Sequence, residues 1–270
     1  MSADGIEIAP GINFERLEKY LEEGKRFDGR TPGQFRDLVI EKGVSKKAEG
    51  SVKVKLGDTE VIVGVKMDVG EPYPDSQDQG NLMVTAEILP LSSGRIELGP
   101  PKFPAIEIGR VVDRGIRESK VIDLKKLCIK EGEKVWTVFI DIYSLNDDGN
   151  LLDAAGIGAL AALKIAKVPK YDEKEGKVLY GEADKDMPLS KVNPIAITVH
   201  KIGNNLIVDP TREEEDLSQG RITMGISDGK ISSMQKGDSA PFTIEEIEKS
   251  VEMADKAWKE LFKNLEKQLK

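Results

Sequence analysis

The chain reads VDPTREEEDLSQGRI over residues 208–222, and this stretch is the best guide to its fold. Five carboxylates fall within eight residues, at positions 209 and 213–216. They follow an apolar, alternating segment, Ile195–Val208, that predicts a β-hairpin turning at Gly203-Asn204-Asn205. Carboxylates gathered at a strand end suggest a metal-dependent or acid/base site, because converging acids neutralise a cation. Taken alone, the run is better explained as a solvated turn, the usual role of charged runs.

C-terminal to this stretch, the pattern predicts a second hairpin and a long helix. Strands at Ile222–Ile226 and Lys230–Met234 flank a turn at 227–229. Thr243 and Glu246 form a capping box. The apolar residues that follow are spaced by three or four positions and indicate an amphipathic helix: Ile247, Val251, Ala254, Trp258, Leu261, Leu265 and Leu269.

N-terminal to the stretch, apolar periodicity predicts a longer version of the same arrangement. One helix is expected to begin after Asn13, and two more are expected over residues 106–120 and 151–166. The expected strands cover residues 52–56, 60–67, 82–89 and 135–145. Residues 171–188 read as a charged connector. Strands followed by helices, repeated in a shorter second part, predict an α+β fold with two similar βα halves and a long C-terminal helix.

This order suggests four segments. We expect an N-terminal helix and arm over 1–35, a core domain over 36–168, a connector over 169–193 and a C-terminal domain over 194–270. The helices at 151–166 and 243–269 are expected to expose apolar faces that one chain of this size does not cover. Stability should then depend on a partner.

The composition excludes several classes of protein. The net charge of −8 argues against a general nucleic-acid binder, so any RNA contact needs a local basic patch. Cys128 is the only cysteine and His200 the only histidine, which excludes internal disulfides, thiolate zinc sites and HExxH metal sites. His200 lies in a strand pattern and is expected to have no chemical role. No apolar stretch approaches the roughly 18 residues of a membrane span. Residues 1–11 have acidic residues and no basic start, so we do not expect them to be a secretory signal. We expect a cytoplasmic protein with no cofactor, no metal and no membrane contact.

Arg110, Arg114 and Arg117 form the one basic constellation that suggests binding. Steps of four and three place the three guanidiniums on one face of the helix expected at 106–120. Arginine suits bidentate phosphate contacts, so the stripe is a candidate RNA-backbone site. A solvated face paired with Asp113 and Glu118 is the alternative, and spacing alone favours it by roughly two to one.

A second constellation, Asp148-Gly149-Asn150, precedes the helix expected at 151–166. Glycine before a helix N-terminus can present amide groups to an anion. Asp147 and Asp148 would repel phosphate there, so helix capping and turn formation are favoured.

Taken in order, these residues resemble the RNase PH family along nearly the whole chain. The resemblance is carried by Arg26–Arg30, Val52–Met67, Ala105–Arg110, Asp148-Gly149-Asn150 and Val208–Thr211 leading to Glu215-Asp216. Gly99-Pro100-Pro101, Arg110–Arg114 and Val135–Val138 look more narrowly like the non-catalytic ring subunits of archaeal exosomes. The resemblance implies an RNase PH-like fold of the ribosomal protein S5 domain 2-like type.

The chain departs from active members of that family at three places. An arginine pair is replaced by residues within Lys102–Ala105, and the phosphate-binding Ser and Arg by Asn150 and Leu151. The second of two aspartates spaced by six would fall at Ile222, counted from Asp216. Three losses together argue against catalysis, because single deletions can leave residual activity.

The resemblance therefore implies a subunit without catalytic residues that binds single-stranded RNA. It would alternate with a catalytic RNase PH-like paralogue in a hexameric ring of three heterodimers, which carries trimeric RNA-binding cap subunits. It would shape the paralogue's site for phosphorolytic 3′–5′ RNA degradation. Two alternatives remain: an active phosphate-dependent 3′-exoribonuclease that uses Asp216 with Asp209 or Glu215, and a free-standing RNA-binding module.

Overall fold

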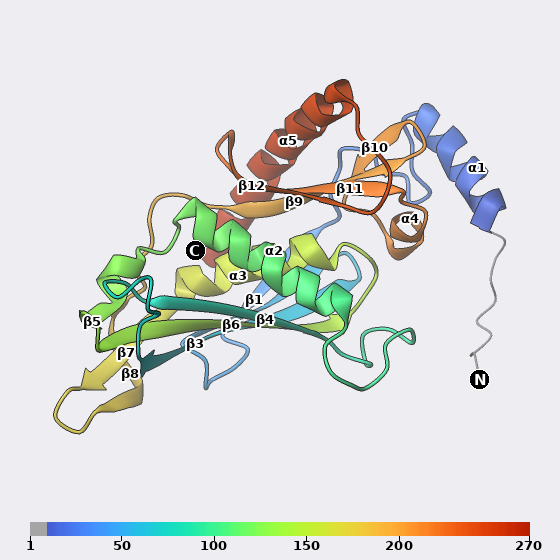
Figure 1. The fold of residues 1–270 in the computed structure, drawn as a ribbon. Coiled ribbons are helices and arrows are strands. Elements are labelled where there is room, and N and C mark those ends of the chain that lie inside the picture. Colours follow the sequence, from blue (N-terminus) through green and yellow to red (C-terminus); the bar gives the residue numbers. More distant parts are fainter. Residues whose placement is uncertain (1–9) are drawn as a thin grey trace.

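The computed structural model describes residues 10–270, and the side chains from residue 14 onward. Four layers alternate between sheet and helix (Figure 1). The larger sheet has the order β1-β2-β3-β6-β4, with β5 against the start of β6. Its strands are β1 (Leu38–Lys42), β2 (Gly50–Leu56), β3 (Thr59–Gly70), β4 (Asn81–Ile88), β5 (Cys128–Lys130) and β6 (Lys134–Asn146). All neighbours are antiparallel except β4 and β6, which are parallel.

The smaller sheet has the order β10-β9-β11-β12 and is antiparallel throughout. Its strands are β9 (Ile195–Ile202), β10 (Asn205–Val208), β11 (Gly220–Ser227) and β12 (Lys230–Gly237). Helices α2 (Phe103–Ser119) and α3 (Leu151–Ile165) lie between the two sheets, and α5 (Ile244–Leu269) covers the outer face of the smaller one (Figure 1). The α+β fold with two similar halves and a long C-terminal helix is thus confirmed.

Helix α3 holds the two halves together because it is buried on all sides. Every residue from Leu151 to Leu163 is buried. A Cβ on Gly156 would lie 2.8 Å from the Cβ of Ala196 in β9, and one on Gly158 would lie 2.5 Å from Val63 in β3. Both glycines are therefore needed for close approach, one toward each sheet.

The expectation that two helices would expose uncovered apolar faces is wrong. Helix α3 is enclosed by both sheets, and α5 buries Ala254, Trp258, Leu261 and Leu265 within the chain. Intramolecular packing removes the argument for a partner-dependent core.

The smaller elements also depart from expectation. Most of the charged segment 171–188 forms a β-hairpin, β7 (Lys167–Asp172) with β8 (Lys177–Asp186), which extends from the body of the molecule (Figure 1). Helix α1 (Pro10–Glu22) packs Leu17 and Leu21 against the smaller sheet. The remaining short elements are a single 3₁₀ turn, η1 (Leu124–Leu127), and α4 (Arg212–Asp216).

Candidate functional site

The acidic stretch forms α4 at the edge of a cavity of about 420 Å³. The backbone amide of Thr211 donates to Glu214 at 2.8 Å, which fixes the first turn of this short helix. Walls of the cavity also come from the 89–102 loop, the start of α2, the start of α3 and strands β9 and β11. This is the region where the resemblance implies an altered catalytic site.

A buried ion pair ties the N-terminal arm to α4. Arg26 and Glu214 are both about 1% exposed, and the Arg26 guanidinium donates to both Glu214 carboxylate oxygens. Arg26 also donates to the carbonyl oxygens of Val208 and Asp209, at 2.9 and 2.8 Å. Glu214 is thus committed to structure and is not available for chemistry.

Asp209 is equally committed. It is fully buried, and Arg36 donates to it from both its backbone amide, at 2.7 Å, and its side chain, at 2.8 Å. Arg30 and Asn150 complete its partners, at 2.9 and 2.8 Å. Burial alone would raise the pKa of Asp209, but the bonds from Arg36 and Asn150 hold that pKa below its usual range. Asp209 is therefore ionised, and both of its carboxylate oxygens already accept hydrogen bonds from the chain.

The N-terminus of α3 already holds an anion from the chain itself. Asn150 has left-handed backbone geometry, with φ of 58°, and its amide donates to the Glu215 carboxylate at 3.1 Å. Burial raises the pKa of Glu215, and Arg212 opposes that rise from 3.4 Å. A carboxylate therefore occupies the backbone donor that would otherwise be open to phosphate.

Asp216 corresponds to the first of the two aspartates of active family members, and it is held between two arginines. Arg95 from the 89–102 loop approaches it at 2.8 Å and Arg212 at 2.9 Å. Arg212 also pairs with Asp147 at 3.2 Å. Among residues 14–270, no group of three or more His, Cys, Asp or Glu side chains is placed to hold a metal ion. The carboxylates of the enzymatic alternative are thus neutralised by guanidiniums.

The position counted as the lost second aspartate does not face the cavity. Ile222 is 4% exposed and belongs to the hydrophobic core, and it does not line the cavity. Strand alternation turns its neighbour Arg221 into the cavity instead, where it pairs with Glu107 at 2.6 Å and Asp238 at 2.8 Å. Either position lacks a carboxylate, so the consequence for chemistry is unchanged.

The other two departures do border the cavity, through Phe103 and Pro104 in one and Leu151 in the other. Lys102 is exposed and pairs with Glu97 at 3.5 Å, just before α2. Leu151 lines the cavity as an apolar, largely buried side chain. Neither supplies the planar, bidentate donor that grips a phosphate.

His200 lines the same cavity and is held neutral. Its Nδ1 lies 3.0 Å from the Ser218 hydroxyl. Burial, with a smaller contribution from the charge of Arg221, lowers the pKa of His200 to about 3. This agrees with a structural histidine in β9.

A pH titration of stability tests this state of His200. Protonation favours the unfolded chain, in which the pKa of this histidine is near 6.5, so the folded protein loses stability as pH falls from 6.5 toward 3. The loss is at most about 1.4 kcal/mol per pH unit. We expect His200→Gln to remove this component, measured as the difference in unfolding free energy between variant and wild type at pH 4.5, 5.5 and 6.5. A difference that does not change with pH contradicts a buried neutral His200.

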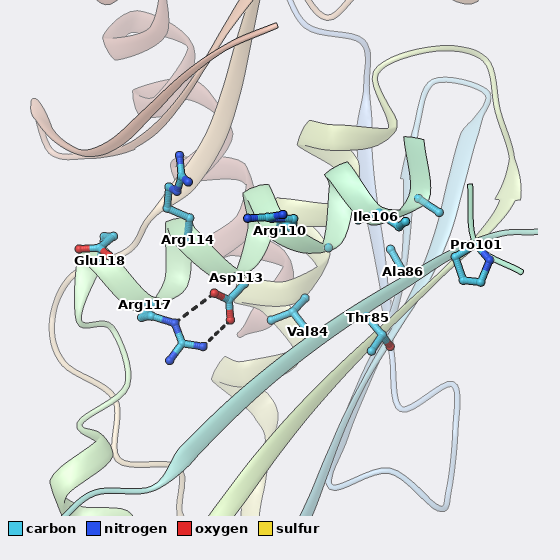
Figure 2. Close-up of a pocket in the computed structure, with 12 residues that line it drawn as sticks. Val84, Thr85, Ala86, Pro101, Ile106, Arg110, Asp113, Arg114, Arg117 and Glu118 are labelled. Atoms are coloured by element: carbon cyan, nitrogen blue, oxygen red, sulfur yellow. Dashed lines mark hydrogen bonds and ion pairs between the residues drawn. The ribbon is translucent and has the colours of Figure 1, made fainter. Parts of the chain in front are cut away.

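The three sequence-predicted arginines lie on one face of α2, above a groove of about 430 Å³ between α2 and β4 (Figure 2). They are not equivalent. Arg117 is paired with Asp113 at 2.7 Å and donates to the Leu82 carbonyl at 3.0 Å. Arg114 has one long contact, 3.4 Å to the Gln235 side chain. Arg110 is exposed and makes no hydrogen bond or ion pair to the part of the chain that the structure describes.

Known proteins share this fold and sequence over nearly the full chain. Two family models match: the 3′ exoribonuclease family domain 1 over residues 34–169 and domain 2 over residues 193–257. The chain therefore belongs to the 3′ exoribonuclease, or RNase PH, family. It is 48% identical to exosome complex component Rrp42 of Thermococcus onnurineus, covering 92% of each chain. It is 41% identical to the Rrp42 component of Methanothermobacter thermautotrophicus, covering 98% of each.

A solved structure supports the same family membership. A chain of the Archaeoglobus fulgidus exosome with RNA bound to the active site superposes with a TM-score of 0.87 at 41% identity, over 96% of this chain and 99% of that one. Within the family, the chain stands among the non-catalytic ring components of the archaeal exosome core. The expected resemblance and the expected lack of catalysis are confirmed. No helix in residues 10–270 is long and apolar enough to cross a membrane.

Proposed function

We propose that this chain supplies an RNA-backbone surface and shapes the active site of a catalytic RNase PH-like paralogue. The two subunits would alternate as three heterodimers in a cytoplasmic hexameric ring that carries trimeric RNA-binding cap subunits. Residues 36–168 and 194–270 would form the two domains of this chain. The observation that carries the proposal is the state of Arg110 and Arg114. Both are exposed on α2, whereas the arginines around the neighbouring cavity are all engaged by carboxylates.

Three features support an electrostatic role for these two arginines. Exposed guanidiniums without an ionic partner keep their charge available to phosphate. The pairing of Arg117 with Asp113 leaves the contact to RNA to the other two, with Arg114 the stronger candidate and Arg110 next. The Archaeoglobus relative was solved as an exosome with RNA at its active site. A free-standing RNA-binding module would not need this likeness to an exosome subunit along its whole length.

Charge reversal at Arg114 tests the proposal. In the complex reconstituted with the paralogue, we expect Arg114→Glu to weaken RNA binding about tenfold for all sequences. The slope of log K against log salt should shrink by about one unit or more, because a phosphate contact and its released counterion are lost. Degradation by the paralogue should slow while the ring stays assembled.

Lys256→Glu provides the matched control. It makes the same change of charge on an exposed residue of α5, on the far side of the smaller sheet. If Arg114→Glu and Lys256→Glu bind RNA equally well at low salt, α2 presents only a solvated face.

A further inference from the structure

The exposed face of α2 changes chemistry along its length. Its C-terminal part carries Arg110 and Arg114, and its N-terminal part carries Phe103 and Ile106, whose side chains are 72% and 50% exposed. Residues 103, 110 and 114 differ by seven and four positions, so they follow one line along the helix. Figure 2 shows Ile106, Arg110 and Arg114 in sequence along this face.

Packing within the chain does not explain an aromatic ring at this place. Phe103 lies at the first position of α2, outside the buried core, and it borders the 420 Å³ cavity. Ile106 borders the 430 Å³ groove on the other side. Exposed apolar side chains of this size beside guanidiniums are the pattern of a single-stranded nucleic-acid platform, in which bases stack on rings while cations hold the backbone.

We propose that Phe103, supported by Ile106, is a base-stacking platform for the RNA strand whose phosphates Arg110 and Arg114 bind. This rests on the proposed function of the arginines and extends it to a second kind of contact. The seven residues from Phe103 to Arg110 span about 10 Å of helix. That length equals about three stacked nucleotides at about 3.4 Å each. One strand can therefore reach both parts of the helix face.

The same face fits a protein partner less well. On α2 itself the exposed apolar surface is two side chains, a small fraction of the roughly 800 Å² that each partner buries in a stable interface. Closing a protein over them would also desolvate Arg110, which makes no ion pair with residues 14–270. An RNA strand supplies a stacking surface and negative charge together.

Three variants of the full reconstituted complex test the platform. We expect Phe103→Ala to weaken the binding of a single-stranded RNA about tenfold, the scale of one lost base stack. The salt slope should stay unchanged, because no counterion is released by stacking. Phe103→Trp should restore the affinity. Leu91→Ala is the matched control, since Leu91 is 77% exposed but lies in the preceding loop.

A base analogue reports the contact directly. An RNA with 2-aminopurine placed at successive positions should show quenching at one position in the wild-type complex, and that quenching should disappear in Phe103→Ala. Unchanged affinity and unchanged quenching in Phe103→Ala overturn the platform. Loss of ring assembly in Phe103→Ala, measured by native mass, would instead assign Phe103 to a protein interface and also overturns it.

The Arg114→Glu variant separates the two proposals. If Arg114→Glu weakens RNA binding and Phe103→Ala does not, the phosphate surface stands and only the platform fails. If neither variant weakens binding, both fail.

Discussion

Glu214→Ala is expected to lower the free energy of unfolding by about 3–5 kcal/mol. The reason is that Arg26 would remain inside the protein as a charge without its ionic partner. The carbonyls of Val208 and Asp209 would still accept its hydrogen bonds, but they carry no net charge to neutralise it. Chemical denaturation of the isolated chain, followed by circular dichroism, measures the change.

The exposed pair of Lys25 and Glu23 gives the control. Its side chains are 66% and 67% exposed, so Glu23→Ala should change stability by less than about 1 kcal/mol. The double variant Arg26→Met with Glu214→Leu should recover much of the loss, because it removes both buried charges. Equal effects of Glu214→Ala and Glu23→Ala would contradict the structural role of the buried pair.

The buried pair of Arg26 and Glu214 is one of several ion pairs formed by the acidic stretch. Asp209 and Glu214 bind the arginines of the N-terminal arm, while Glu215 and Asp216 bind Arg212. The carboxylates beside the cavity join the arm, α3 and α4. The carboxylates that the enzymatic alternative would use thus stabilise the fold instead, since a carboxylate held by two arginines is a poor ligand for a cation.

Sequence alone predicts the elements whose patterns are local. The helix at 244–269 follows from its capping box and apolar stripe, and strand β3 follows from strict alternation that buries Val61, Val63 and Val65. The hairpin of β7 and β8 was missed because most of its residues are exposed and polar, which leaves no alternation to detect. Burial of α3 on both sides could not be predicted, because a uniformly apolar helix sequence does not reveal how many surfaces pack against the helix.

The details of the site depend on long-range contacts that periodicity does not contain. Asp209 meets Arg30 and Arg36 across more than 170 residues of chain. Counting six positions from Asp216 gives Ile222, but the turn after α4 and the pleat of β11 bring Arg221 to the cavity. Similarly, the shared helix face of the three arginines was visible in the sequence, whereas the bond from Arg117 to the Leu82 carbonyl was not.

The isolated chain is expected to release no nucleoside diphosphate from poly(A) in the presence of phosphate and Mg²⁺. Leu151 offers no donor to phosphate, Glu215 occupies the amide at the start of α3, and Arg221 stands on the cavity side of β11. Losing one preorganised electrostatic contact typically costs a factor of about 10²–10³ in rate, and the phosphate and acidic sites are both altered here. The complex with the paralogue is the positive control under the same conditions. Turnover by the purified chain that disappears in Asp216→Asn would show that Asp216 escapes Arg95 and Arg212 to act in catalysis, and would refute the non-catalytic role.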